Sequence, residues 1–170
     1  KTAYEMIWWL EFRRVLFRSI QINNNTDIKK SNKITFLGTH LCHLYEKYRL
    51  KQFWIIKKYL DDVDFLLGDF NALNREDYDE KTLNKIEDDR NKSYWEKCCF
   101  DLVDKIKDSG FNVYPYINFT SRFQTRIDYI FYTNKWKKCD QKIIDCQTNK
   151  LSDHNMVICH INLWKSKNIE

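Results

Sequence analysis

The sequence predicts a layered α/β domain, or part of one. Two short runs, 33–41 and 63–67, are apolar on both alternating faces, which is typical of strands buried on both sides. Two longer stretches, 46–60 and 94–110, carry apolar residues at helical spacing and predict helices that bury one face. Strands that alternate with helices favour an α/β arrangement. With 170 residues, 43% of them apolar, the chain can form one domain with a real core.

The remaining elements follow from the same rules. Residues 23–33 are polar and predict a loop, and the charged stretch 74–93 predicts a solvated, partly helical excursion. Gly110 marks the end of the second helix. Three further strands are predicted, at 126–133, 142–148 and 155–163.

Composition narrows the class of protein. The net charge of +5 is compatible with a polyanionic partner such as nucleic acid, although basicity of this size is common. The six cysteines form no C-x-x-C pair, and Cys98 and Cys99 are adjacent within the predicted helix. We therefore expect the thiols to be reduced and mostly buried, and the protein to be located inside the cell, in the cytosol or nucleus. No run reaches the ~18 apolar residues of a membrane span.

Residues 1–19, KTAYEMIWWLEFRRVLFRS, differ in composition from the rest of the chain. They contain paired tryptophans and three arginines but no asparagine, whereas the later residues are rich in Asn, Lys, Asp and Ile. Charges interrupt the apolar part, which argues against a signal peptide; an amphipathic basic helix is the alternative. The stretch resembles translated sequencing-adapter read-through. We expect residues 1–19 to be non-native and residues 20–170 to be a partial domain.

Polar residues recur where the predicted strands end or begin. Asp69 and Asn71 follow Gly68 and, being two residues apart in an extended chain, point to the same side. Each polar residue alone has a structural explanation as a turn or cap. A carboxylate inside an apolar strand, as at Asp128, is costly unless it has a partner. The full set at strand ends is His40, Asp69, Asn71, Asp128, Asp153 and His154.

This set has the chemistry that metal-assisted hydrolysis of a phosphate ester requires. Carboxylates hold a hard divalent ion, for which we expect Mg²⁺, with Mn²⁺ as the alternative. Such an ion neutralises the phosphate charge and the leaving oxygen. A carboxylate can orient the attacking water, and an amide can donate to phosphoryl oxygens. A histidine beside a carboxylate is held in one tautomer for proton transfer.

Four motifs, in order along the chain, carry a resemblance to a known family. They are GTHL at 38–41, GDFNAL at 68–73, RIDYIF at 126–131 and LSDHNMV at 151–157. Together they resemble the endonuclease/exonuclease/phosphatase superfamily, which has the DNase I-like fold. By this resemblance, the fold is a two-sheet β-sandwich flanked by helices, with the site at one end where the sheets meet.

The resemblance also implies a role for each matching residue. Asp69 would orient or deprotonate the attacking water, and Asn71 would hold that water or the phosphate. His154 would contact the scissile phosphate or act as general base, and Asp128 would support a catalytic histidine. Asp153 would bind the metal or position its neighbour.

Further positions match less specifically. His40 would contact phosphate or donate a proton, and Arg126 would contact phosphate, with a solvated surface arginine as the alternative. Arg49 and Gln52 match positions that we interpret as structural. The family also has an upstream strand with an asparagine and another with a metal-binding glutamate, which nothing in residues 20–33 supplies. We therefore expect an incomplete domain that binds metal weakly and turns over slowly.

The resemblance implies a metal-dependent phosphodiester hydrolase. A nuclease acting on nucleic acid is the first expectation, and a phosphatase or sphingomyelinase-type member with another phosphodiester substrate is an alternative. A non-catalytic module that binds nucleic acid or protein is a third hypothesis. Five aromatic residues between the second helix and the RIDYIF strand either stack bases or pack a loop on the sandwich. They are Phe111, Tyr114, Tyr116, Phe119 and Phe123.

Overall fold

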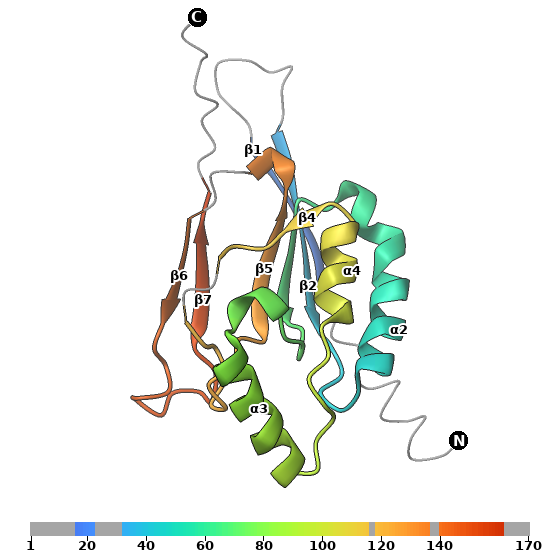
Figure 1. Cartoon of the computed structure of the whole chain (residues 1–170). Helices are drawn as coiled ribbons and strands as arrows, with labels where there is room; N and C mark the ends of the chain where they lie inside the picture. The colour runs from blue at the N-terminus through green and yellow to red at the C-terminus, as the bar shows by residue number, and fades with distance from the viewer. Residues whose placement is uncertain (1–15, 23–31, 116–117, 137–139, 162–170) are drawn as a thin grey trace, which may run out of the picture.

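The computed structural model describes residues 16–22, 32–115, 118–136 and 140–161, which form two sheets and three α-helices (Figure 1). The larger sheet has the strand order β1-β2-β3-β5-β4, and β6 and β7 form the smaller one. This confirms the expected two-sheet α/β architecture. The strands are β1 (Leu16–Ile22), β2 (Asn32–His40), β3 (Phe65–Asp69), β4 (Phe111–Asn112), β5 (Asp128–Thr133), β6 (Asp140–Ile144) and β7 (Met156–His160).

The helices lie between the strands of the larger sheet in sequence. The α-helices are α2 (Glu46–Ile56), α3 (Glu80–Lys92) and α4 (Asp101–Asp108); short 3-10 helices are η2 (Lys57–Asp62), η3 (Arg75–Asp77) and η4 (Asn134–Trp136). Strands β2 and β3 are parallel and are joined through α2, whereas β5 runs antiparallel to β3. No described helix has the length and apolar character that crossing a membrane requires.

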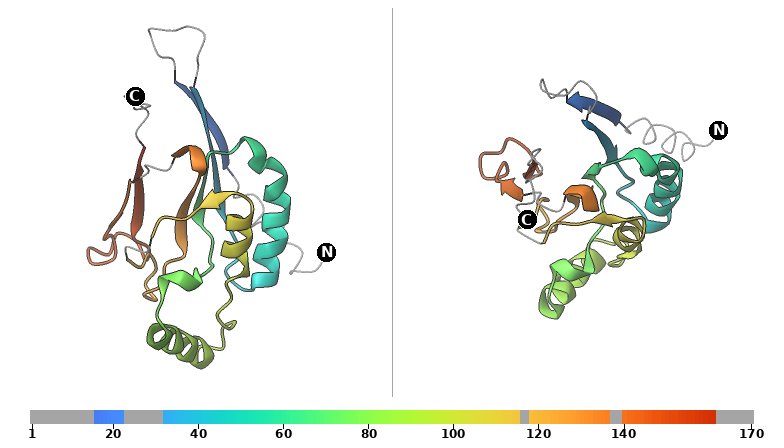
Figure 2. Two further views of the ribbon diagram at one scale, coloured as in Figure 1. Left: turned by 45° about the horizontal axis from the view of Figure 1, so that its top comes forward. Right: turned by 90° about the horizontal axis from the view of Figure 1, so that it is seen from above.

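One face of the larger sheet packs against α2 and α4. Alternate residues of the central strands, among them Leu37, Leu66 and Phe131, point into this layer. They meet Phe53 from α2 and apolar residues of α4, whose charged residues face outward. Helices α2 and α4 lie across β5 from the β6–β7 hairpin (Figure 1 and Figure 2). The other face of the sheet is therefore the one turned toward the hairpin.

A buried ion network fixes the start of α2. Arg49 is 2% exposed, and its guanidinium donates to the carboxylates of Glu46 and Glu96 at 2.7 and 2.6 Å. The Glu96 carboxylate also accepts from the backbone N–H of Glu46, so it caps a helix whose own N-cap residue offers no side-chain bond. Gln52 accepts from the Cys42 N–H at 2.8 Å. These contacts agree with the structural role expected for Arg49 and Gln52.

Two predictions about the second half of the chain are wrong. The helix expected at 94–110 begins only at Asp101, because α3 ends in a turn and the following residues bond elsewhere: the Cys98 N–H donates to Glu87 at 2.7 Å. Cys98 and Cys99 therefore lie in an irregular connection. Cys159 is disulfide-bonded, so the expectation of reduced thiols fails there. Cys42, Cys98, Cys99 and Cys146 are free.

The other differences concern element ends. Strand β6 stops at Ile144, because the Asp145 carboxylate accepts from the N–H groups of Gln147 and Thr148 and turns the chain. Strand β1 crosses residue 19 and pairs with β2 from Leu16 onward. The loop expected at 23–33 and the end of the strand expected at 155–163 fall mostly outside the described residues.

Candidate active site

The register of the larger sheet places three of the expected site residues in one row. His40 is the Cα partner of Asp69 across β2 and β3, and Asp69 is the partner of Asp128 across β3 and β5. Directly paired residues project from the same face of a sheet. The three side chains therefore emerge together at one end of the sheet, on the face away from α2 and α4.

Gly68 makes this close arrangement of strands possible. Its φ is +135°, and a Cβ atom at this position would lie 1.9 Å from the carbonyl oxygen of Thr39 in the neighbouring strand. Only glycine has both the backbone freedom and the missing side chain that this contact needs. Gly68 therefore fixes the approach of β2 to β3 directly beside Asp69.

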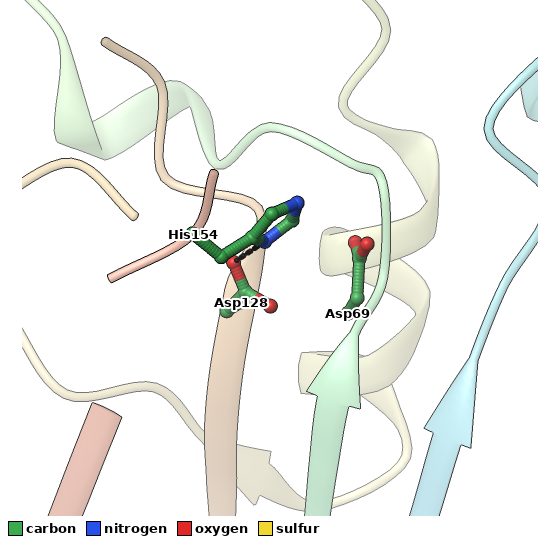
Figure 3. A group of neighbouring side chains, drawn as sticks. All are labelled: Asp69, Asp128 and His154. Carbon is green, nitrogen blue, oxygen red and sulfur yellow. Dashed lines mark hydrogen bonds and ion pairs between the residues drawn. The ribbon is translucent and has the colours of Figure 1, made fainter. Parts of the chain in front are cut away.

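His154 completes the site from the segment that precedes β7 (Figure 3). Its Nδ1 lies 2.8 Å from Asp128 Oδ2, and the Asp69 carboxylate faces the same space from the end of β3. Each of the three residues offers a ligand atom, and these atoms all lie within 4.8 Å of one another. Among the described residues, this is the only such group of His, Cys, Asp or Glu side chains.

Backbone bonds hold His154 in place. It forms a β-bridge with Ser121, and the Arg122 N–H donates to the Asp153 carbonyl at 3.0 Å. The Thr120 hydroxyl accepts from the N–H of Asp128 at 3.0 Å, and the Thr120 carbonyl accepts from Asn155. The 120–125 turn thus joins the start of β5 to the segment before β7, which brings Asp128 and His154 together.

The electrostatics of the group are those of two crowded carboxylates and a histidine. Burial raises the pKa of Asp69, and the negative charge of Asp128 raises it further. Burial alone would lower the pKa of His154. The hydrogen bond to Asp128 and the charges of Asp128, Asp69 and Asp153 outweigh burial and raise that pKa. The site therefore favours the imidazolium form of His154 and attracts a cation.

Asn71 and His40 flank the group. Asn71 has a φ of +49°, its N–H donates to Asp69 Oδ1 at 2.8 Å, and its side-chain amide donates to the Leu41 carbonyl at 3.0 Å. It therefore ties the loop after β3 to the loop after β2 and orients Asp69. His40 Nε2 lies 3.5 Å from Asp69 Oδ2 and is partly exposed.

The structure does not bring Arg126 and Asp153 into this group. The Arg126 guanidinium is 4% exposed, lies 3.6 Å from an Asp77 oxygen, donates to the Tyr114 carbonyl and stacks on Tyr129. These are the contacts of a buried structural cation, and neither expected alternative, a phosphate ligand or a solvated arginine, describes them. Asp153 is exposed next to His154, and its side chain lies outside the three-residue group, so the geometry does not support it as the main metal ligand.

The five aromatic residues do not share one surface. Phe111 is 4% exposed and belongs to the core, whereas Phe123 is 49% exposed. Tyr116 lies outside the described residues, and the Tyr114 hydroxyl bonds to Asp140. Of the four that the structure describes, only Phe123 lines the cavity of about 880 Å³ that also contains Asn71 and His154.

The donor set fits a divalent cation. The negative charges of Asp69 and Asp128 lie close together and repel each other, and a bound cation would relieve this repulsion. His154 engages Asp128 Oδ2 and the Asn71 N–H engages Asp69 Oδ1, so Asp69 Oδ2 and the second oxygen of Asp128 are the oxygens best placed for an ion. Carboxylate oxygens are the ligands that Mg²⁺ and Mn²⁺ prefer.

Comparison with known proteins identifies the family. The model of the endonuclease/exonuclease/phosphatase family matches residues 11–154. The chain belongs to this family. Members of the endonuclease/exonuclease/phosphatase family are hydrolases, often nucleases, and generally use divalent metal ions. No curated protein sequence matches the chain significantly.

The solved structure of an endonuclease domain agrees with the family at the level of fold. The endonuclease domain of TRAS1, a telomere-specific non-LTR retrotransposon, superposes with a TM-score of 0.55 at 16% identity. That match covers 89% of this chain, and this chain spans 65% of the TRAS1 domain. A functionally unknown conserved protein from Enterococcus faecalis V583 gives a TM-score of 0.46 at 15% identity, covering 88% of this chain and 68% of that one.

Proposed function

We propose that this chain carries the catalytic end of a metal-dependent phosphodiester hydrolase that acts on nucleic acid. The observation that supports it most is the row His40–Asp69–Asp128 with His154 bonded to Asp128 at 2.8 Å. Costly carboxylates gathered at one sheet end have no evident packing purpose. They have a direct use in phosphate ester hydrolysis.

The position of each residue in the site suggests its role in hydrolysis. Asp69 and Asp128 would hold the divalent ion, which supplies positive charge to the phosphate oxygens and to the leaving oxygen. Asp69, which faces the ion's place from the end of β3, would also orient the attacking water toward the phosphate. Asp128 fixes His154 through Nδ1, so that Nε2 is free to donate to a phosphate oxygen. His40 lies on the far side of Asp69 as a second phosphate contact.

The test is cleavage of end-labelled DNA and RNA in Mg²⁺ and in EDTA. We expect metal-dependent cleavage that falls by about 10²- to 10⁴-fold in Asp69→Asn and in His154→Ala. The matched control is His160→Ala, an exposed histidine at the end of β7, which should cleave at the wild-type rate. Cleavage that survives EDTA, or a His154→Ala variant as fast as wild type, would contradict the proposal.

The same assay separates the remaining hypotheses. Tight nucleic-acid binding without cleavage at any metal concentration would favour the non-catalytic module, and hydrolysis of a phosphomonoester or lipid diester in preference to nucleic acid would favour the other substrates. That the chain is an incomplete domain stays a prediction. A chain extended upstream at its genomic locus should then cleave faster than the 170-residue chain.

A further inference from the structure

The cavity beside His154 continues away from the row of carboxylates as a groove between two segments. One wall is α3 with the connection that follows it, and the other is the 121–125 turn. Asn71 and His154 lie at the end of the groove where the catalytic group is. A substrate whose phosphate reaches His154 therefore has its neighbouring atoms in this groove.

Two exposed aromatic rings meet across the groove. Trp95 and Phe123 are 45% and 49% exposed, and their rings pack edge to face with centroids 4.6 Å apart and planes at 89°. The Arg122 guanidinium lies 4.8 Å from the centre of the Phe123 ring. These aromatic rings are half exposed, and one of them contacts a cation. Such rings present a surface on which a flat, electron-rich group can stack.

Tyr94, which precedes Trp95 and lines the same cavity, occupies a backbone position that disfavours a side chain. Helix α3 ends in a Schellman motif, in which the Trp95 N–H bonds to the Arg90 carbonyl and the Tyr94 N–H bonds to the Asn91 carbonyl. Tyr94 occupies the left-handed position of this motif, with a φ of +56°, where glycine is the usual residue. Its side chain is 97% exposed. No packing contact explains a tyrosine held there.

Both sides of this aromatic platform (Tyr94, Trp95 and Phe123) are anchored to the rigid part of the protein. Glu96, which follows Trp95, is held by the buried Arg49 at 2.6 Å. On the other side, the β-bridge between Ser121 and His154 places Phe123 two residues from a direct backbone contact with the catalytic histidine. The platform therefore lies in the same cavity as His154.

The charges of the groove favour a polyanion. Two of its acids already have cations: Asp89 lies 3.8 Å from Lys92, and Glu96 pairs with Arg49. Lys85 and Arg122 line the groove as well, and among the described residues no ion pair engages either of them. The groove thus offers positive charge beside stackable rings, the combination that single-stranded nucleic acids bind.

We propose that this platform stacks an unpaired base next to the scissile phosphate, so that the enzyme acts on single-stranded or frayed nucleic acid. The inference rests on the proposed hydrolase function and names its substrate. In a duplex each base is stacked between its neighbours and presents only its edges, so a ring surface gains nothing from it. An unpaired base can leave the stack of its neighbours and lie against the ring of Trp95 or Phe123.

The test measures binding without cleavage. A labelled short oligothymidylate is titrated with protein in EDTA and followed by fluorescence anisotropy. Removing one stacked base–aromatic contact should weaken binding, so Trp95→Ala should raise Kd by about 5- to 150-fold. Trp95→Phe should recover most of that loss. The matched control is Trp54→Ala, a 51% exposed tryptophan on α2, which should bind as wild type does.

A second probe distinguishes stacking from charge. An oligonucleotide of the same length that consists of abasic sugar-phosphate units keeps the phosphates and lacks the bases. Wild type and Trp95→Ala should bind it equally weakly. The proposal is overturned if Trp95→Ala binds oligothymidylate like wild type, or if it loses affinity for both probes alike. A protein that shows the expected binding pattern and yet cleaves no diester in Mg²⁺ supports the platform and refutes the hydrolase function.

Discussion

Replacing Arg49 by alanine should be among the most damaging single changes in this protein. Its guanidinium is 2% exposed and donates to Glu46 Oε2 at 2.7 Å, to Glu96 Oε2 at 2.6 Å and to the Cys42 carbonyl at 3.2 Å. Removing one partner of a buried ion pair costs about 3–5 kcal/mol, because the remaining charge stays buried without compensation. Here two carboxylates would lose their cation at once.

The remaining bonds limit that loss. Glu46 would still accept from the Leu102 N–H at 2.8 Å, and Glu96 would still cap α2. We therefore expect the free energy of unfolding to fall by about 3–5 kcal/mol, and Tm by roughly 6–20 °C. Because domains of this kind are stable by only about 5–15 kcal/mol, the variant should be visibly compromised.

Urea unfolding followed by circular dichroism measures this change. The control is Arg75→Ala, which removes an arginine paired with Glu80 where both side chains are exposed. Exposed pairs contribute about 0–1 kcal/mol, so this variant should unfold close to wild type. If Arg49→Ala lost less than about 1 kcal/mol, the buried network would not be what holds α2 and the Glu96 connection.

Three other substitutions test separate parts of the structure. Gly68→Ala should cost about 3 kcal/mol or more, because its Cβ would collide with the Thr39 carbonyl; a wild-type melting temperature would contradict this. Tyr94→Gly should raise the free energy of unfolding by about 1 kcal/mol, because it removes a tyrosine from a left-handed backbone position. A lower free energy of unfolding in urea titration would contradict this. Burial opposes ionisation of Asp64, but the Thr35 N–H and Lys135 outweigh it and lower its pKa. Its carboxylate therefore stabilises the fold above the pKa of the unfolded chain, near pH 4, and this is lost as pH falls through the lowered pKa. The stability difference between wild type and Asp64→Asn should accordingly shrink as the pH falls below about 4, and a difference that stays constant with pH would refute the assignment.

The row of site residues could be predicted because strand ends are visible in the sequence. Each apolar run stops at a polar residue, and side-chain alternation along a strand decides which of those residues share a face. His40, Asp69 and Asp128 needed only a register that aligns the three ends, and the observed pairing supplies it.

Burial of charged residues could not be predicted in the same way. Arg126 begins the RIDYIF motif and has the right chemistry for phosphate, but Asp77 comes from the charged 74–93 stretch and lies 3.6 Å from its guanidinium. Nothing local distinguishes Asp77, 2% exposed, from its solvated neighbours. The Arg49–Glu96 pair joins residues far apart in sequence, so it carries no periodic signal. The apolar residues of the 94–100 connection fit helical spacing, which predicts a helix there. In the structure, Tyr94 and Trp95 line the groove instead.

Under the proposed function, the register of the sheet separates the phosphate chemistry from the selection of the substrate. The three residues in the row belong to hydrogen-bonded strands, whereas the platform belongs to the connection after α3 and to a turn. The 79–100 segment follows Tyr78, whose hydroxyl accepts from the Arg126 N–H next to β5. The platform residues can change without displacing a reacting atom, provided that Glu96 keeps its bond to Arg49. Such a separation would allow the members of one family to keep the same chemistry and act on different substrates.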